Sequence, residues 1–534
     1  MSRAPLATGL DRAIAAVSPK WAANRLRARF TFNAISGWDA AKSERPGMRN
    51  FSPLSQTADG DTLPGLDVQR SRSRELIRNA PIATGAVHTV VTNVVGTGLR
   101  MSAQADRVVL SARAGMNAEA VAQFEGQAEQ EWRLFSRRDH CDTSARLTFA
   151  GMQELAFRSV LADGDVFCAV VAAGQGAPFD FALQLIDADR ISNPGRAPDR
   201  ERLAGGIETA PSGRPLAYHV ADVSRIMQFP TAWRRLPATA PDGTPRVIHL
   251  MHAGRIDQSR GVPYLAPVMS ALKTLDRYTE AELTAAVLNA CIAIMGESAT
   301  GASPLQIEAV AAGTGAAGGT GLQRADINFE PGMVLEGFMP GETLKSFSPE
   351  RPNAGFDPFT QAVLRQVGVA LELPFELLIK HFTASYSAAR AALLQAWGFF
   401  RMRRQWLADG FCQPVYELVI RNAVLKGRIA APGFLTDPLL RAAYCGARWT
   451  GPSPGQIDPL KEVNAAEKRL GLMLSTRTRE TAELTGDDWE SVAAELKTEA
   501  DLIAELALPA VMMPPDPVAA PVEAPSAEDM ADAA

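Results

Sequence analysis

A glycine-rich stretch between two helical segments is the feature that most limits what this chain can fold into. Residues 298–325 contain six glycines and many alanines, and therefore offer little apolar surface for packing. The segments on either side, 265–295 and 355–373, carry apolar residues at helical intervals. This order predicts two helices that flank a small mobile tip, rather than one continuous core.

The rest of the sequence predicts an α+β fold that is mainly helical. Apolar residues at helix-like intervals predict two helices in series over 67–95, with Pro81 at the start of the second. Residues 118–162 and 458–506 also have helical patterns. Residues 165–250 instead consist of short β-type runs separated by turn sequences such as "NPG" and "PDGTP", which predicts a mixed sheet region.

A long helix with a single apolar seam is expected to begin near Tyr386. Its seam residues are spaced 7, 4, 3, 7 and 4 apart: Tyr386, Leu393, Trp397, Phe400, Leu407 and Phe411. Three arginines, Arg401, Arg403 and Arg404, lie on or beside its other faces. Pro414 should kink or end the helix, because proline lacks the backbone N–H that a helix interior needs.

The two ends of the chain differ from its middle. Residues 1–65 mix basic, small and turn-forming residues and predict a loosely ordered basic arm; no apolar run follows the basic residues, so we expect no secretory signal. Residues 508–534 contain six prolines and several acids but no basic residue, which predicts a disordered tail. The longest apolar run, near 283–295, is too short to cross a bilayer, so we expect no membrane segment.

The charge balance limits the partners of the chain. Lys and Arg total 54 and Asp and Glu total 59, which gives a formal net charge of −5. Such a chain does not hold nucleic acid by bulk attraction, so any DNA contact must be local or loose. The hydrophobic fraction of 46% and the charged fraction of 21% are those of a globular protein.

Motifs for catalysis and for cofactors are weak. "GTGAAG" (313–318) fits a dinucleotide pattern, but no apolar strand precedes it. "GPSPG" (451–455) fits a nucleophile elbow, but Pro454 lacks the N–H that would stabilise an oxyanion, so Ser453 is expected in a loop. The dipeptide Gly-Lys never occurs, which excludes a Walker A phosphate loop. We therefore predict neither an enzyme nor a cofactor.

Metal sites are also not expected. Five single cysteines without a CxxC motif (Cys141, Cys168, Cys291, Cys412 and Cys445) favour a reducing compartment without structural zinc. Asp187 and Asp189 would share one face of a strand, which leaves a divalent-metal site formally open, although solvated carboxylates at a strand end, one near Arg190, are favoured. His249 and His252 are three apart on an extended segment and should face opposite sides.

Two basic features have both an ordinary and a functional interpretation. Four arginines alternate with small residues in one helix: Arg70, Arg72, Arg74 and Arg78. A solvated helix face is favoured for them over a contact with phosphate. Lys380 and His381 lie in a short polar break between helices, which is either an ordinary turn or a loop presented to a ligand.

Several strings, in one order, resemble the lambda family of tailed-phage portal proteins. They are "RSRELIRNAPIATGAVHTVVTNVVGTGL" (72–99), "IDADRISNP" (186–194), "GGIETAPSGRPLAYHV" (205–220), "VIHLMHAGRIDQSRGVPYLAPVMSALKTLDRYTEAEL" (247–283), "FTASYSAARAALLQAW" (382–397) and "IDPLKEVNAAEKRLGLMLSTRTRETAELTGDDWE" (457–490). Each string alone is unspecific, but together they extend across about 70–490.

The resemblance implies a portal-type fold with named parts. These parts are a loose N-terminal arm (1–65), a wing (66–262), a first stem helix (263–297), a clip (298–354), a second stem helix (355–375), a tunnel loop with the start of a wing helix (376–390), the rest of the wing (391–456), a crown (457–507) and a disordered tail (508–534).

The resemblance also implies a function and partners. The chain would form a homo-oligomeric ring, dodecameric in the family, at one capsid vertex, through which double-stranded DNA is packaged and ejected. Its partners would be the terminase large subunit, the head–tail connector, and the major capsid and scaffold proteins, in the virion and, during assembly, in the host cytoplasm. Lys380, His381 and Thr383 would face the DNA in the tunnel loop, and Arg401, Arg403 and Arg404 are candidate phosphate contacts.

Two other classes of protein remain as alternatives. Another phage head or connector protein would also lack catalytic motifs, but it would not need two long helices around an excursion. A metal-dependent nuclease would use Asp187 and Asp189 and would lose its cleavage activity on Asp187→Ala.

Overall fold

The computed structural model describes residues 9–25, 53–222, 230, 232–290, 294–298, 342–346, 355–381, 386–455 and 459–505. The predicted mobile tip (298–325, apart from its first residue), Thr383, the acidic tail and much of the predicted N-terminal arm lie outside these residues. The chain divides into two compact units, residues 1–61 and 62–534. The first unit contains α1 (Gly9–Val17) and a further helical run over 19–25.

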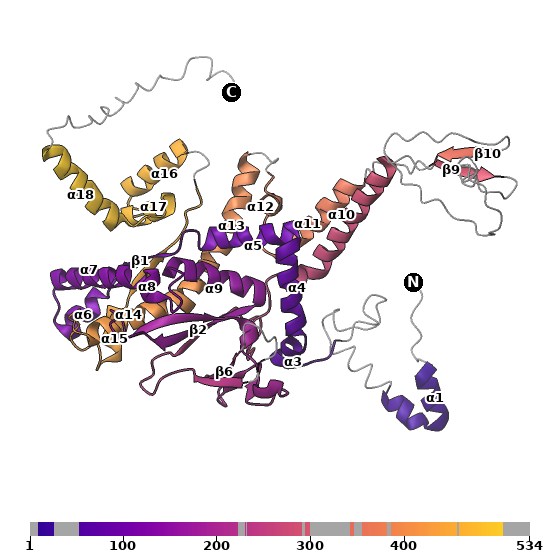
Figure 1. Cartoon of the computed structure of the whole chain (residues 1–534), viewed down its shortest axis with the longest axis horizontal. Coiled ribbons are helices and arrows are strands. Elements are labelled where there is room, and N and C mark those ends of the chain that lie inside the picture. The colour runs from indigo at the N-terminus through magenta and orange to yellow at the C-terminus, as the bar shows by residue number, and fades with distance from the viewer. Residues whose placement is uncertain are drawn as a thin grey trace, which may run out of the picture. The chain divides into compact units, whose positions relative to one another are not determined.

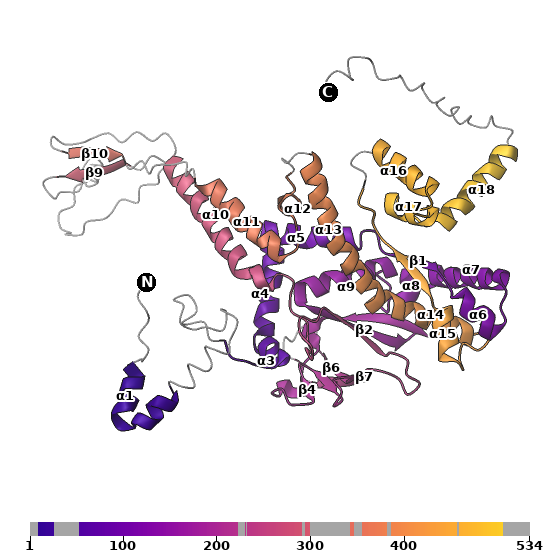
Figure 2. The same ribbon diagram turned by 180° about the vertical axis from the view of Figure 1, so that it is seen from behind.

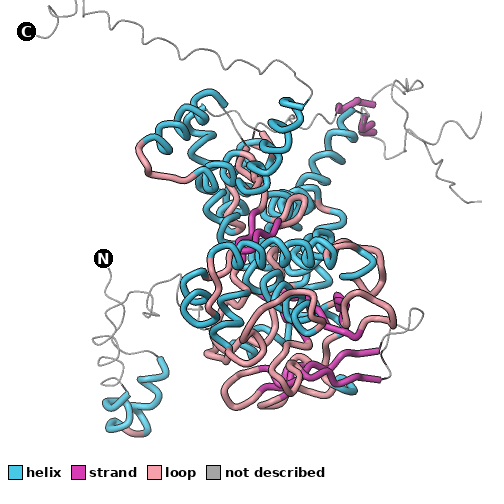
Figure 3. The backbone as a smooth tube through the Cα atoms, turned by 90° about the vertical axis from the view of Figure 1, so that its left-hand side faces the viewer, coloured by secondary structure: helices cyan, strands magenta, loops and turns pink. Residues whose placement is uncertain are grey.

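The second unit is an α+β fold in which helices predominate, as predicted (Figures 1 and 3). Its helices, preceded by α3 (Ala58–Thr62), are α4 (Leu66–Asn79), α5 (Pro81–Val94), α6 (Arg107–Ala114), α7 (Ala118–Phe135), α8 (Arg138–Cys141), α9 (Phe149–Asp163), α10 (Met269–Ala290), α11 (Phe356–Ala370), α12 (Phe375–Ile379), α13 (Tyr386–Leu407), α14 (Gln413–Leu425), α15 (Pro438–Tyr444), α16 (Pro459–Gly471), α17 (Arg477–Leu484) and α18 (Trp489–Glu505).

The strands of the described residues form four small antiparallel sheets. A three-stranded sheet has β2 (Asp165–Ala172) between β3 (Phe181–Ile186) and β8 (Val247–Met251), and a four-stranded sheet has the order β4 (Leu203–Ala204), β5 (Ile207–Thr209), β6 (Pro215–Asp222), β7 (Ala232–Pro237). Two pairs complete the set: β1 (Arg100–Ala103) with β11 (Ala447–Thr450), and β9 (Ile294–Ser298) with β10 (Glu342–Ser346). The mixed region predicted for 165–250 is therefore confirmed as two sheets.

The helices that precede and follow the strands largely match the predictions. Pro81 begins α5 directly after α4 ends, because its fixed φ and missing N–H suit the first turn of a helix. The long helix from Tyr386 ends at Leu407 and passes through a π-helical turn, 408–412, into α14. Pro414 lies in the first turn of α14, so the helix does not end at this proline, and the interruption is the π-helical turn before it.

One large core joins the helices to the three-stranded sheet. At its centre Trp132 meets the rings of Phe149, Tyr416 and Trp449 edge-on, with centroids 4.8, 5.9 and 5.3 Å away. Helix α9 packs on both α5 and β2 and buries the face that holds Phe149 and Phe157. A smaller cluster, which includes Phe167 and Tyr218, fills the space between the two larger sheets.

Helices α10 and α11 lie side by side and run in opposite directions (Figure 2). Tyr278, near the middle of α10, packs on Phe356 and Phe359 at the start of α11, with ring centroids 5.4 and 5.5 Å away. At the other end of the pair, the Tyr264 hydroxyl donates to the carbonyl of Leu371. The glycine-rich stretch thus connects the far ends of an antiparallel helix pair.

Candidate functional site

A sharp turn after α11 positions the predicted polar break. Leu371 and Leu373 are buried on either side of Glu372, whose φ of 55° is in the left-handed region. The Leu373 N–H donates to the carbonyl of Gly368 at 2.9 Å, and a Cβ at residue 368 would lie 2.6 Å from the Leu373 oxygen. The close approach requires glycine at 368, and it reverses the chain so that α12 packs on α5.

Lys380 ends α12 in a left-handed conformation, with φ 56° and ψ 37°. Its N–H and that of His381 both donate to the carbonyl of Glu376, which closes the last turn. The side chains of Lys380 and His381 are exposed, whereas Leu378, two residues earlier, is buried. The helix therefore anchors the segment and leaves both basic side chains facing solvent.

The three arginines of α13 have different surroundings. Arg401 is exposed and lies 3.5 Å from Glu483. Arg403 lies over the ring of Phe399, and burial lowers its pKa. Arg404 donates to three backbone carbonyls, those of Asn93, Val94 and Pro452, at 3.0, 3.2 and 2.8 Å. Burial lowers the pKa of Arg404 to about 10. Of the three, Arg401 presents its guanidinium to solvent, whereas Arg404 holds α13 to the end of α5.

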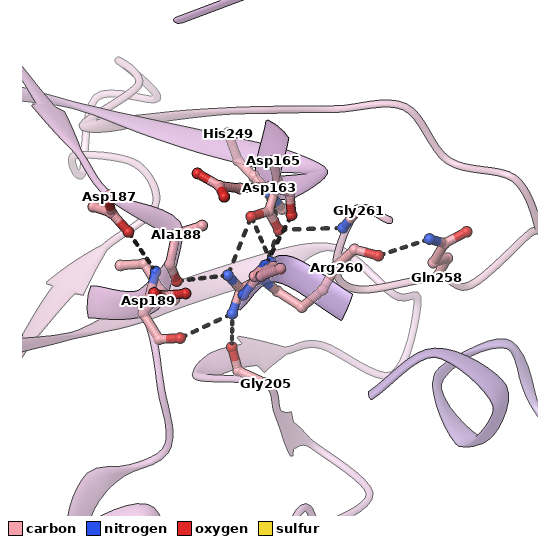
Figure 4. Close-up of polar contacts among 12 residues, drawn as sticks. Asp163, Asp165, Asp187, Ala188, Asp189, Gly205, His249, Gln258, Arg260 and Gly261 are labelled. Carbon is pink, nitrogen blue, oxygen red and sulfur yellow. Dashed lines mark hydrogen bonds and ion pairs between the residues drawn. The ribbon is translucent and has the colours of Figure 1, made fainter. Parts of the chain in front are cut away.

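A buried charge cluster lies at the start of β2, and the sequence analysis did not predict it. Asp165 is fully buried, and its carboxylate accepts a hydrogen bond from Arg260 Nε at 2.6 Å (Figure 4). It accepts another from Arg70 Nη2 at 2.8 Å. Burial alone would raise the pKa of Asp165, but Arg260, His249 and Arg70 outweigh it and hold that pKa far below its usual value. The carboxylate is therefore ionised inside the protein.

Arg260 joins this carboxylate to three other segments of the chain. Its guanidinium donates to the carbonyls of Ala188, Ile191 and Gly205 at 2.7 to 2.8 Å. Both Arg260 and Arg70 are 2% exposed, and Arg70 also donates to the carbonyl of Asp163 at 2.8 Å. The prediction of a solvated face for Arg70 was wrong, because the side chain pairs with a carboxylate that lies 95 residues away in the sequence.

Arg74 pairs with Asp187 and Asp189, the two carboxylates for which a divalent-metal site was left open. It contacts three carboxylates: Asp163 at 2.6 Å, Asp187 at 3.2 Å and Asp189. Asp187 also accepts from the Asp189 N–H and so caps the 3₁₀ turn that follows β3. The predicted partner, Arg190, donates instead to the carbonyl of Ala221. An arginine thus pairs with both carboxylates of the nuclease alternative, and across the described residues no three His, Cys, Asp or Glu side chains are grouped to hold a metal ion.

The two histidines face opposite sides, as predicted. His249 is buried and stacks on Phe167 with ring centroids 4.2 Å apart, and its Nε2 lies 3.5 Å from Asp165. Burial lowers the pKa of His249 more than Asp165 raises it, so the ring is neutral. His252 is exposed. The stretch "GPSPG" is a loop, as expected for Ser453.

The described residues contain neither a disulfide nor a helix that could span a membrane. Cys141, Cys168, Cys412 and Cys445 are buried and free, and burial raises the pKa of each thiol. No helix in the described part of the chain is both long and apolar enough to cross a membrane.

Comparison with known proteins gives consistent matches. The model of the family described as phage portal protein, lambda family, matches residues 44–404. The portal protein of Escherichia phage N15 is 26% identical over 463 residues, 84% of this chain and 86% of the relative. Portal protein B of Escherichia phage lambda is 25% identical over the same length and the same shares. A chain from the neck of an empty GTA particle is 16% identical with a TM-score of 0.40, over 78% of this chain and 93% of that chain.

Proposed function

The chain belongs to the lambda family of phage portal proteins, and on that premise we propose that twelve copies form a ring around an axial channel for double-stranded DNA. Portal proteins are structural components of the virion rather than enzymes. The ring would occupy one vertex of the capsid, where DNA enters during packaging and leaves during ejection. A separate packaging ATPase, the terminase large subunit, would supply the energy, because the chain has no Walker A loop.

The antiparallel pair of α10 and α11 supports this proposal most strongly. The pair presents Leu283, Val287 and Phe359 to solvent, which are 65%, 56% and 55% exposed. Apolar side chains along both helices of a projecting hairpin are suited to contact with neighbouring copies. In this scheme α10 and α11 form the stem, and residues 298–354 form the clip to which terminase and later the head–tail connector bind.

The other parts follow from the same scheme. The sheets and the helices that pack on them form the wing, and α16 to α18 form the crown. The segment with Lys380, His381 and Thr383 is the tunnel loop that faces the DNA, with Arg401 as a further phosphate contact. Major capsid and scaffold proteins contact the outside of the ring during assembly in the host cytoplasm.

Purified protein should therefore form rings of about a dozen copies with an open axial channel, as cyclic homo-oligomers do. Native mass spectrometry gives the number of copies, and negative-stain imaging gives the lumen. A compact dimer without a lumen would contradict the proposal, and so would the absence of rings both in the purified protein and in heads assembled with the scaffold.

Reversing the charge of the tunnel loop should impair DNA packaging without preventing ring assembly. Lys380→Glu replaces twelve positive charges with twelve negative ones along the path of the phosphates, and sliding DNA depends on weak contacts spread over the ring. We expect the packaged DNA per head to fall roughly tenfold, which corresponds to about 1.4 kcal/mol at the limiting step. Nuclease-protected DNA measures the effect.

Two variants control for the charge and for the backbone at this position. Arg214→Glu makes the same change of charge in an exposed turn of the four-stranded sheet and should leave packaging unchanged. Lys380→Asn removes the positive charge and introduces a residue type that tolerates the left-handed backbone at this position. Equal packaging by Lys380→Glu and by the parent would exclude Lys380 from the channel wall.

A further inference from the structure

Helices α16, α17 and α18 have almost no core of their own. Among the described side chains of residues 459–505, only Ala466 and Glu480 are buried. Eight large apolar side chains are exposed on the same 47 residues: Leu460, Val463, Leu472, Met473, Leu474, Leu496, Leu502 and Ile503. So many exposed apolar groups on so small a unit indicate a protein partner.

Three of these residues form a projecting apolar tip, Leu472, Met473 and Leu474, between α16 and α17. Met473 is 91% exposed and has a left-handed φ of 55°, which is strained for a residue other than glycine or asparagine. The N–H groups of Leu472 and Leu474 donate to carbonyls at the end of α16. The backbone therefore holds the apolar tip in a defined conformation.

A partly buried ion pair fixes the base of the apolar tip. Arg469 of α16 donates to both carboxylate oxygens of Glu480 of α17, at 2.9 and 2.6 Å. Thr476 caps α17 by accepting from the Arg479 N–H. The two helices are thus joined on either side of the apolar tip, which is the kind of rigid support that a contact surface needs.

Helix α18 carries a complementary surface, the α18 stripe, made of Leu496, Ala500 and Ile503. Their spacing of 4 and 3 residues puts them on one side of the helix. Every residue from 494 to 505 is exposed, so no other described part of the chain covers this half of α18. The α18 stripe is therefore available to another molecule.

The charges around the two surfaces are opposite. Exposed basic side chains, Lys468, Arg477 and Arg479, flank the apolar tip. Residues 494–505 carry four acidic side chains and one basic one, a net charge of −3. Contact between two tips, or between two copies of α18, would bring like charges together, whereas contact of the tip with α18 pairs opposite charges.

We propose that the apolar tip of one copy packs on the α18 stripe of the next copy around the ring. This inference rests on the proposed function, because a ring requires a contact between two different surfaces of the same chain. The contact repeats at every subunit boundary, covers the apolar residues that α16 to α18 leave exposed, and holds these helices as one continuous collar.

Disulfide trapping between copies tests this contact. Full-length chains with Met473→Cys are co-assembled with differently tagged chains that carry Leu496→Cys or Ile503→Cys, and the rings are oxidised mildly. A disulfide forms only when the two Cα atoms come within about 7 Å. Thr498→Cys, two residues from Leu496 and on another side of α18, is the matched control, and oxidised parent rings give the background from the natural cysteines.

The expected result is a covalent dimer of the two tagged chains with at least one stripe position, several-fold more abundant than with Thr498→Cys. Equal yields from Thr498→Cys and from both stripe positions would overturn the inference, as would dimers formed mainly between two Met473→Cys chains. If intact rings form but no stripe position is trapped, this contact is wrong while the proposed function stands. If the parent forms no ring, either as purified protein or in heads assembled with the scaffold, the proposed function itself fails.

Discussion

Removing the buried carboxylate, by Asp165→Ala, should destabilise the second unit by about 3–5 kcal/mol, the usual result of breaking a buried ion pair from one side. The variant leaves Arg260 and Arg70, each 2% exposed, as buried cations without their carboxylate partner. Guanidinium-induced unfolding, followed by tryptophan fluorescence, should show a transition at clearly lower denaturant concentration.

Asp189→Asn is the control for this prediction. Asp189 also pairs with an arginine, Arg74, but it is 49% exposed, so the loss should be no more than about 1 kcal/mol. Similar midpoints for Asp165→Ala and the parent would show that the buried pair contributes nothing to stability.

A double-mutant cycle separates the pair from its surroundings. Arg260→Met alone also leaves a buried charge without its partner, whereas Asp165→Ala with Arg260→Met removes both charges. The double variant should therefore lose less stability than the sum of the two single losses. Simple additivity would mean that Arg260 acts mainly through the carbonyls of Ala188, Ile191 and Gly205.

The sequence predicted the parts of the fold that local patterns determine. Apolar periodicity and Pro81 predicted α4 and α5, and alternating short runs predicted β2, β3 and β8. Both ends of one predicted helix differ from the prediction. The first stem helix was expected over 263–297, but Pro267 lies in a 3₁₀ turn over 266–268 and α10 begins at Met269. At the other end, residues Ile294–Ser298 form the strand β9, so the predicted helix to residue 297 was wrong there. Such signals lie within a few residues of the element that they predict.

Long-range pairing of charges could not be predicted in this way. Arg70 lies in a helix whose sequence reads as polar, and only the fold brings it to Asp165. A charged residue in a sequence is by default assigned to solvent, because an unpaired charge is rarely buried. The one available signal was Asp165 itself, an acid at the first position of an otherwise apolar strand.

The candidate tunnel loop was found from sequence, but its geometry was not. The polar break at Lys380 and His381 was visible between two apolar patterns. The left-handed backbone at Glu372 and Lys380 has no signature in the sequence, because neither residue is a glycine or an asparagine. The sequence likewise did not distinguish Arg404 from Arg401. Only the structure shows that the Arg404 side chain donates hydrogen bonds to three backbone carbonyls.

Gly261→Ala should be strongly destabilising, with a loss of about 3 kcal/mol, at the upper end for overpacking. A Cβ at residue 261 would lie 1.9 Å from the oxygen of Gly164 and 2.4 Å from its carbonyl carbon. Both contacts are with backbone, so no rotamer change can relieve them. Denaturant unfolding measures the loss, and a midpoint equal to that of the parent would show that the two backbones do not approach so closely.

Gly398→Ala is the matched control and should have the opposite sign. Gly398 lies inside α13, and a Cβ there meets no atom within 4 Å. Alanine in a helix interior is more stable than glycine by about 0.5–1 kcal/mol, so this variant should be slightly more stable than the parent. The pair of variants therefore separates the close backbone approach from a general effect of adding a methyl group.

The close approach of the Gly164 and Gly261 backbones also connects the buried charge cluster to the start of α10. Gly261 follows Arg260, and its N–H donates to Asp165 at 3.2 Å. Three residues later, the Tyr264 N–H donates to the carbonyl of Leu161 at 2.9 Å, just before the chain enters α10. A methyl group at 261 must push these segments apart and so change the direction of α10. Gly261→Ala should therefore reduce ring formation even under conditions in which the monomer stays folded.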